Sequence, residues 1–406
     1  MALALIYGAP LGVGGLGMQA ATALRSLTLL GEVSAIGPGP QAWPFADQPS
    51  NVQWVTTTPL DDRARLLKGR ARYRSDREFG QRASEHVRAL SPTCCYGFTQ
   101  ISLESAAYCR DNGVPFILDN PNGHIRNLRS VCQREFWRWC STPFAGSPTE
   151  AMVRRVEEEY SLATRIRVSS NFSKDTMVQA GVPAEKIEVL PQFLNLGRFR
   201  RSSEQPFPTP TGPLRVCFVG SLDLRKGFLY LLRAIRKIGS HNVTLRLVGN
   251  TGDPWCKRLL AREAKGLDVK IMPGDPVPSC HWAEVCVTPS LEDGFGFVVA
   301  EAMASSVPVI VSDQCGAAEW VQHGTTGWVV PSRSEPPVDW HVQVRQEDLL
   351  AQYLQLALDN RPRLAEMGQA ALQAVSHRAN EQNASLLANW FYLSTMMAPA
   401  PSGSPS

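Results

Sequence analysis

The feature that most constrains the fold is an alternation of short apolar segments with longer helical patterns, which occurs twice along the 406-residue chain. In the first series the predicted strands are residues 4–7, 33–36, 52–55, 94–97, 115–118 and 165–168. In the second series they are residues 214–219, 243–248, 269–271, 285–288, 307–311 and 327–330. Strands that alternate with helices form open parallel sheets covered by crossover helices. The sequence therefore predicts an α/β protein with two similar sheets that face one cleft.

The two series are separated by residues 198–213, a polar and proline-rich interval that is typical of an interdomain linker. We predict an N-terminal domain over residues 1–197 and a C-terminal domain over residues 214–375. Helical patterns over residues 347–358, 362–375 and 378–393 close the chain. Residues 398–406 contain only Ala, Pro, Ser and Gly and are predicted to be disordered.

Composition narrows the class of protein. No segment approaches the roughly 18 apolar residues of a membrane span, and residues 1–7 lack the basic start of a signal peptide, so they are better interpreted as the first strand. The ten cysteines are scattered without zinc-like spacing or the density of a disulfide scaffold. Reduced thiols in a cytoplasmic protein are the simpler interpretation.

A basic segment lies in the N-terminal half of a chain whose net charge is +4. It comprises Arg63, Arg65, Lys68, Arg70, Arg72, Arg74 and Arg77, interrupted by apolar side chains. A solvated charged face is the favoured interpretation. The alternative is contact of Arg63–Arg77 with an anionic acceptor or with the inner membrane surface, which would make the protein peripheral there.

The segment 289–312, PSLEDGFGFVVAEAMASSVPVIVS, joins a glycine turn to a helix and then to a strand. Gly294 and Gly296 let the backbone turn tightly, and a helix is predicted from Phe297 until Pro308 precedes the next strand. The first amides of such a helix lack partners and can bind a phosphate. Asp293 and Glu301 lie eight residues apart and can accept hydrogen bonds from hydroxyl groups on either side of a diphosphate. The pattern is typical of a nucleotide-sugar site.

This segment resembles the signature of the retaining glycosyltransferases of family 4, also called group 1, which have the GT-B fold of two Rossmann-like α/β domains facing an interdomain cleft. The family usually has two Glu residues where this chain has Asp293 and Glu301. The resemblance implies that Glu301 holds the ribose of the donor and that Asp293 contacts the transferred sugar. It also implies that the last helix, residues 376–397, returns to the N-terminal domain.

The loop 220–227, GSLDLRKG, follows the first strand of the second domain. It resembles the family's loop in which a Lys, and usually an earlier Arg, neutralise the donor diphosphate. Lys226 matches the Lys, whereas Ser221 stands where the family commonly has Arg, and Arg225 is the candidate that compensates. We therefore predict donor contacts from Ser221 and Arg225 as well as from the turn residues Gly294, Phe295, Gly296, Phe297 and Val298.

The N-terminal domain offers two further candidates. Its glycine-rich loop, residues 8–17, could indicate a dinucleotide site, but the second strand ends without an acid for a ribose. In the family a comparable loop lines the cleft, so Gly14 and Gly15 are predicted to lie beside the donor phosphate. His124 follows a predicted strand, at the sheet edge where α/β proteins bind ligands. The family often presents a His from this edge to the transferred sugar.

The chain departs from the family after Pro191, where Phe193 and Asn195 replace the usual Gly and Asp. The resemblance nevertheless covers most of the chain. It implies retaining transfer of a sugar from a nucleotide diphosphate sugar to a hydroxyl acceptor, with His124, Lys226, Asp293 and Glu301 as the reacting set. No cofactor, metal ion or nucleic acid is expected. Two alternatives stay open: a catalytically weak nucleotide-sugar-binding or scaffold protein, and a dinucleotide oxidoreductase.

Overall fold

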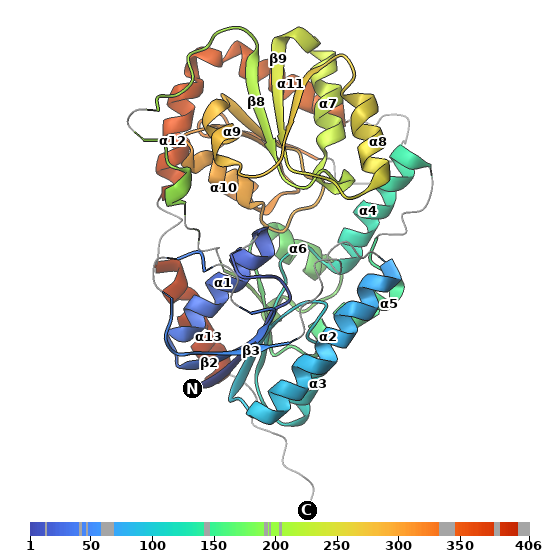
Figure 1. The fold of residues 1–406 in the computed structure, drawn as a ribbon, viewed down its shortest axis with the longest axis vertical. Helices are drawn as coiled ribbons and strands as arrows, with labels where there is room; N and C mark the ends of the chain where they lie inside the picture. Colours follow the sequence, from blue (N-terminus) through green and yellow to red (C-terminus); the bar gives the residue numbers. More distant parts are fainter. Residues whose placement is uncertain are drawn as a thin grey trace, which may run out of the picture. The chain divides into compact units, whose positions relative to one another are not determined.

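The computed structural model describes residues 1–12, 14–39, 43–45, 48–57, 69–141, 147–190, 194, 196–202, 205–332, 346–376 and 382–396. The chain divides into two compact units, and each is described by itself. Unit 1 comprises Met1–Ser130, Phe144–Asn195 and Ala379–Ser406, and unit 2 comprises Val131–Pro143 and Leu196–Arg378. Figure 1 labels the helices and strands of both units.

Unit 1 is built around a parallel sheet of seven strands in the order β3-β2-β1-β4-β5-β6-β7. The strands are β1 (Ala2–Ile6), β2 (Glu32–Gly37), β3 (Val52–Thr56), β4 (Cys94–Phe98), β5 (Phe116–Asp119), β6 (Arg165–Val168) and β7 (Ile187–Val189). The helices are α1 (Gly14–Thr28), α2 (Gly69–Leu90), α3 (Leu103–Asp111), α4 (Ile125–Cys140), α5 (Glu150–Leu162), α6 (Asn171–Gln179) and α13 (Gln382–Met396).

Unit 2 has a parallel sheet of six strands in the order β10-β9-β8-β11-β12-β13. The strands are β8 (Leu214–Val219), β9 (Val243–Val248), β10 (Asp268–Met272), β11 (Val285–Thr288), β12 (Val309–Ser312) and β13 (Gly327–Val330). The helices are α7 (Phe228–Lys237), α8 (Pro254–Glu263), α9 (Val277–Trp282), α10 (Phe297–Ala304), α11 (Gln346–Asp359) and α12 (Leu364–Ser376). Short 3-10 helices cover Gly197–Phe199, Leu224–Lys226 and Gly316–Trp320.

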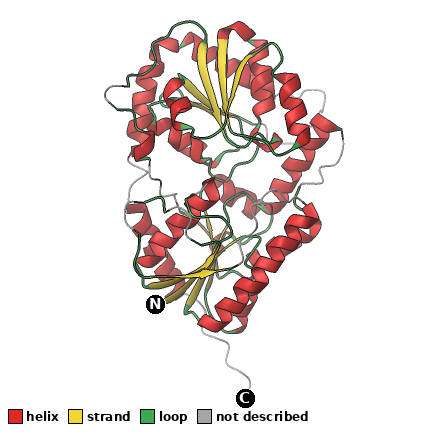
Figure 2. Cartoon of the chain, in the orientation of Figure 1, coloured by secondary structure: helices red, strands yellow, loops and turns green. Residues whose placement is uncertain are grey.

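The central strands are apolar on both faces, as parallel strands between two helix layers must be. All residues of β5, β11 and β12 are buried. Figure 2 shows helices on either side of the strands in each unit. The two parallel α/β domains predicted from the alternation of strands and helices are therefore confirmed.

Most elements begin and end within a few residues of the sequence-based ranges, and three differences matter for the fold. Strand β7 was not predicted as a strand, and α1 begins at Gly14, inside the predicted glycine-rich loop of residues 8–17. The contact pattern also assigns Val131–Pro143, which includes the last ten residues of α4, to unit 2. Nothing in the periodicity of the sequence marks such a change of unit inside a helix.

The C-terminal helix α13 belongs to unit 1, where it packs against α1. Phe391 of α13 is fully buried, and its ring lies 6.0 Å from that of Tyr96 on β4. The predicted tail 398–406 lies outside the described residues, as do Arg63, Arg65, Lys68, Phe193 and Asn195. Within the part of the chain that is described, no helix combines the length and the apolar character needed to cross a bilayer.

Candidate active site

The strand order of unit 2 places two loops at the point where ligands usually bind in open α/β sheets. The chain runs outward from β8 in one direction through β9 and β10, and in the other direction through β11, β12 and β13. Crevices at such a switch point open outside the carboxyl ends of the two central strands. The loop after β8 contains residues 220–227 and the loop after β11 contains residues 289–296. Both motifs predicted from the sequence therefore meet at one sheet edge.

At Gly227 the backbone of the first loop lies in contact with the backbone of the second loop. The φ of Gly227 is +73°, and a Cβ at this position would lie 2.0 Å from the carbonyl oxygen of Pro289. Only glycine fits such an approach. The loop before it is closed by Asp223, whose carboxylate accepts hydrogen bonds from the Lys226 backbone N–H at 3.2 Å and from the Ser221 hydroxyl at 2.6 Å. Ser221 therefore holds the loop together from the position where the family commonly has Arg.

The turn before α10 depends on Gly296. Its φ is +84°, and a Cβ would lie 2.3 Å from the Cys315 Sγ. Phe295 is buried, with its ring 5.3 Å from Phe297 and 5.0 Å from Trp320. The predicted helix start at Phe297 is confirmed. The N–H groups of Phe297 and Val298 precede the first hydrogen bond of α10, which the Val299 N–H donates to the Gly296 carbonyl at 3.0 Å, and they are suited to an anion.

Two successive ion pairs link the loops. The Arg225 guanidinium donates to the Glu292 carboxylate at 3.0 Å and to the Glu292 carbonyl at 2.6 Å. The Lys226 ammonium donates to the Asp293 carboxylate. Burial acts to raise the pKa of Asp293, but the positive charges of Lys226 and Arg225 outweigh it and hold the pKa below its usual value. Asp293 is therefore an ionised carboxylate beside Lys226, the cation that is predicted to bind the diphosphate.

Glu292 is the residue that sequence reasoning missed. It falls outside the eight-residue spacing of the two acids, yet its side chain is fully buried against Arg225. The adjacent basic pair Arg225-Lys226 and the adjacent acidic pair Glu292-Asp293 were the available signal. Because Glu292 engages Arg225, that guanidinium positions the two loops as well as adding positive charge to the site.

Glu301 lies on α10, partly buried, and no hydrogen bond to its carboxylate is present among the described residues. Burial raises its pKa to about 7. The positive charge of Arg198 opposes this rise, and the negative charge of Asp275 adds to it. Arg198 and Asp275 form an ion pair with each other. A buried carboxylate without a partner is costly unless a ligand supplies hydrogen-bond donors. Ribose hydroxyls are donors of that kind.

In unit 1, Gly14 and Gly15 are not in a loop, which corrects the prediction of their setting. They form the first turn of α1 and are exposed. The glycine that the fold requires here is Gly17, where a Cβ would lie 2.1 Å from the carbonyl oxygen of Pro10. A donor contact from Gly14 or Gly15 stays a prediction, and it would have to come from the backbone of a helix start.

His124 follows β5 and is buried, with 2% of its surface exposed. Its Nδ1 accepts a hydrogen bond from the Arg126 N–H at 3.2 Å, so in the neutral ring the proton is on Nε2. Nε2 lies 3.9 Å from a Glu157 carboxylate oxygen. Burial lowers the pKa of His124, with Glu157 opposing and Arg126 adding to that effect. The fold thus keeps a neutral imidazole with a donor N–H.

A second buried group at this edge of unit 1 was also missed. Asp119, which ends β5, accepts hydrogen bonds from Gln19 at 2.5 Å, from Tyr96 at 2.6 Å and from Arg167 at 3.2 Å. All four side chains are buried. Burial raises the pKa of Asp119, and Arg167 is the main opposing influence. This network fixes the strand end from which the His124 segment departs.

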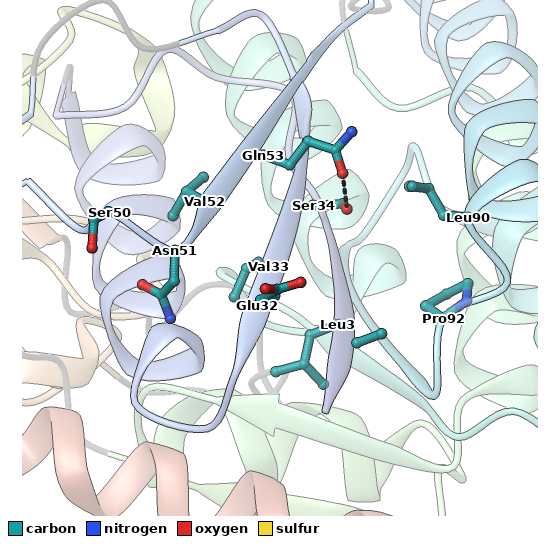
Figure 3. Close-up of a pocket in the computed structure, with 11 residues that line it drawn as sticks. Leu3, Glu32, Val33, Ser34, Ser50, Asn51, Val52, Gln53, Leu90 and Pro92 are labelled. Atoms are coloured by element: carbon teal, nitrogen blue, oxygen red, sulfur yellow. Dashed lines mark hydrogen bonds between the residues drawn. The ribbon is translucent and has the colours of Figure 1, made fainter.

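A pocket of about 380 Å³ lies elsewhere in unit 1. Figure 3 shows its lining, which includes the first residues of β1, β2 and β3 and a hydrogen bond of 3.3 Å between Ser34 and Gln53. It opens at the amino ends of the strands. None of the predicted site residues lines it. The pocket is therefore separate from the switch-point residues.

Comparison with solved structures identifies the fold. Sucrose-phosphate synthase from Thermosynechococcus elongatus aligns with a TM-score of 0.70 and 19% identity, covering 98% of this chain and 99% of that one. HepE from Anabaena, solved in complex with UDP and glucose, aligns with a TM-score of 0.64 and 18% identity, covering 97% and 99%. These likenesses show the fold, and the GT-B class predicted from the motifs is confirmed.

The family follows from the second unit. Residues 213–344 match the family described as Glycosyl transferases group 1. Residues of this chain are also 30% identical over 220 positions to the GDP-mannose-dependent alpha-(1-6)-phosphatidylinositol monomannoside mannosyltransferase of Mycobacterium tuberculosis, covering 48% of this chain and 54% of that protein. In this match and two others, the chain spans about half the length of the curated relative, from 49% to 54%. Residues 213–344 of unit 2 are therefore similar to a group 1 glycosyl transferase domain.

Proposed function

We propose that the protein is a glycosyltransferase that moves a sugar from a nucleotide diphosphate sugar to a hydroxyl acceptor. The observation that carries this proposal is the meeting of Lys226, Asp293 and the start of α10 at the switch point of unit 2, with Glu301 one turn further along the same helix. A cation and free amides suit a diphosphate, and carboxylates suit the hydroxyl groups on either side of it.

The donor is proposed to bind with its diphosphate between Lys226 and the first amides of α10. Glu301 accepts hydrogen bonds from the ribose, and Asp293 accepts one from the transferred sugar. The turn at Gly294 and Gly296 brings the backbone of Phe297 and Val298 to the phosphates. Phe295 supports the turn by packing and does not contact the donor, because its ring is buried against Phe297 and Trp320.

The proposed reaction retains the configuration of the sugar. The bond between the anomeric carbon and the diphosphate oxygen breaks, and both electrons leave with the nucleoside diphosphate. The acceptor hydroxyl attacks the same face of the oxocarbenium-like sugar, and its proton passes to the departing phosphate oxygen. Lys226 and the helix amides stabilise the charge that grows on the diphosphate, a contribution worth about 10²–10³ in rate for one donor group. No metal ion takes part in this proposal.

Two similar proteins suggest which nucleotide sugars to test as donors. HepE was solved with UDP and glucose, and the mycobacterial relative is described as GDP-mannose-dependent. UDP- and GDP-sugars are therefore the first donors to test. The acceptor is proposed only as a hydroxyl compound. The predicted contact of His124 with the sugar stays a prediction, as does membrane contact through Arg63–Arg77, of which Arg70, Arg74 and Arg77 are exposed on α2.

A screen of nucleotide sugars tests the proposal. Thermal stabilisation identifies the donor, and release of nucleoside diphosphate in the presence of hydroxyl acceptors measures transfer. The anomeric coupling in the proton NMR spectrum of the product reports retention. Stabilisation by a nucleotide sugar without turnover with any acceptor would favour the alternative, a catalytically weak binding or scaffold protein.

A further inference from the structure

The last ten residues of α4 form an amphipathic helix segment on unit 2. Its inner side is anchored on α7: the Tyr230 hydroxyl donates to Glu135 at 2.5 Å, and the Tyr230 ring lies 5.4 Å from Trp139. The Arg233 guanidinium lies over the Trp139 ring, 4.2 Å from the ring centre. Phe136 is buried as well and contacts the first turn of α8. The outer side of this segment is thus held in a fixed orientation.

Two tryptophans are exposed here, one on the α4 segment and one on α8. Trp137 is 61% exposed and Trp255, at the start of α8, is 42% exposed. The ring of Phe136, the neighbour of Trp137, lies 6.2 Å from that of Trp255. Figure 1 shows α8 beside the C-terminal end of α4. Tryptophan is enriched at interfaces and in membrane-interface belts, where one end of its ring system is apolar and the other meets water.

The charges around these tryptophans are positive. Lys257, Arg258 and Lys265 are exposed on α8 and just after it, and no ion pair to an acid is found for them among the described residues. The Arg258 guanidinium lies 5.6 Å from the Trp255 ring centre. The acids nearby are turned inward: Glu135 and Glu263 are 2% and 8% exposed, and they pair with Arg134 and Arg262. Among the described residues, Lys257 and Arg258 therefore carry positive charge on the outer surface without a paired acid.

We propose that this surface, made by Trp137, Trp255, Lys257, Arg258 and Lys265, binds the surface of an anionic lipid bilayer. Tryptophan side chains favour the boundary between headgroups and acyl chains. Lysine and arginine beside them are attracted to anionic headgroups. The surface lies on unit 2 and is distinct from the basic residues of α2 in unit 1. It is independent of the proposed sugar transfer, since none of its residues belongs to the switch-point site.

Flotation with vesicles of phosphatidylcholine alone, and of phosphatidylcholine with phosphatidylglycerol, tests the proposal on the full-length protein. Wild type is expected to float with the anionic vesicles at low salt and to be released at high salt. Lys257→Gln with Arg258→Gln is expected to lower the partition coefficient roughly 25-fold, about fivefold for each charge. Trp137→Ala with Trp255→Ala is expected to lower it about tenfold or more.

Two matched variants control for general effects. Ile271→Ala removes an apolar side chain that is 52% exposed on β10, and Arg363→Gln removes a cation that is 59% exposed. Both are expected to float as wild type does. A second readout is quenching of tryptophan fluorescence by brominated lipid, which the double tryptophan variant should largely lose.

The proposal is overturned if wild type fails to float with anionic vesicles, or if the double tryptophan variant floats as well as wild type. A triple variant on α2, Arg70→Gln with Arg74→Gln and Arg77→Gln, gives a further test. If it fails to float while Lys257→Gln with Arg258→Gln floats as wild type does, membrane contact belongs to unit 1 and the proposal is also overturned. Binding to an acidic polysaccharide without binding to vesicles would replace the lipid surface by a glycan.

Discussion

The Lys226 ammonium donates a hydrogen bond to the Asp293 carboxylate, so the cation predicted to hold a diphosphate is already paired with the acid predicted to contact the sugar. The pair joins the loop after β8 to the loop after β11, beyond the carboxyl ends of the two central strands of unit 2. A diphosphate carries more negative charge than one carboxylate. Donor binding can therefore draw the ammonium from Asp293 to the phosphates and release the carboxylate for a sugar hydroxyl.

The first prediction concerns this exchange. Lys226→Ala is expected to lower kcat/KM by about 10²–10³, because the charge that grows on the leaving diphosphate loses its counter-ion. Asp293→Asn should lower turnover while leaving the affinity for free nucleoside diphosphate equal to or higher than that of wild type, since Lys226 is no longer held by an anion. Calorimetric titration with nucleoside diphosphate separates the two effects. Wild-type affinity in Lys226→Ala would contradict the assignment.

The second prediction concerns the neighbouring pair. Glu292→Ala leaves the Arg225 guanidinium with only the carbonyl oxygen as an acceptor on this loop, and the loss of a buried partner costs about 3 kcal/mol of unfolding free energy. The melting temperature should fall accordingly. Glu366→Ala, which removes one partner of the exposed pair Arg363–Glu366 at 4.0 Å, is the control and should melt as wild type does. Equal melting temperatures for both variants would show that Glu292 does not hold the loops.

The third prediction follows from the pKa of Glu301, which burial raises to about 7 from 4.5. When an acid has a higher pKa in the folded state than in the unfolded state, the folded state keeps its proton up to a higher pH. The protein therefore loses stability as the pH rises from the unfolded-state pKa to the folded-state pKa. Glu301→Gln should therefore melt higher than wild type at about pH 8 and equally at about pH 4. A difference that does not change with pH would contradict the buried carboxylate.

The same group should control donor affinity. Only the ionised carboxylate accepts hydrogen bonds from both ribose hydroxyls, so wild-type affinity for a nucleoside diphosphate should increase as the pH rises through about 7. Glu301→Gln should lack this increase and keep only the dependence that comes from the phosphates themselves. Calorimetry on both proteins over the same pH range measures the difference.

The fourth prediction concerns the turn. Gly296→Ala is expected to lower the unfolding free energy by about 2–4 kcal/mol, because the new Cβ meets the Cys315 Sγ and the backbone keeps a positive φ. Gly274→Ala is the matched control. Its φ is +99°, but nothing lies within 4 Å of the added atom, so only the backbone strain of about 1 kcal/mol remains. Chemical denaturation of both variants checks the difference, and equal losses would remove the role given to Cys315.

Most of the fold could be predicted from the sequence, because parallel strands such as 214–219 and 285–288 consist mainly of apolar residues and lie between clear turn signals. The switch-point site followed from spacing along the chain, since Asp293, the turn and Glu301 belong to one segment. Glu292 could not be assigned in this way, because its role depends on a contact with Arg225, 67 residues away. The start of α1 at Gly14 was missed because glycine disfavours helices in general and is accepted here by the fold. The transfer of residues 131–143 to unit 2 depends on Tyr230 and Trp255, which no local pattern indicates.

The measurement that tests the central claim most directly is acceptor-dependent release of nucleoside diphosphate by wild type and by Glu301→Ala, at equal concentrations of a donor that stabilises wild type. Melting curves in the absence of donor establish that both proteins are folded. The proposed site predicts turnover by wild type and a loss of about 10²-fold or more in kcat/KM for the variant, since its donor loses the ribose contact. Unchanged turnover in Glu301→Ala would show that unit 2 does not hold the donor as proposed.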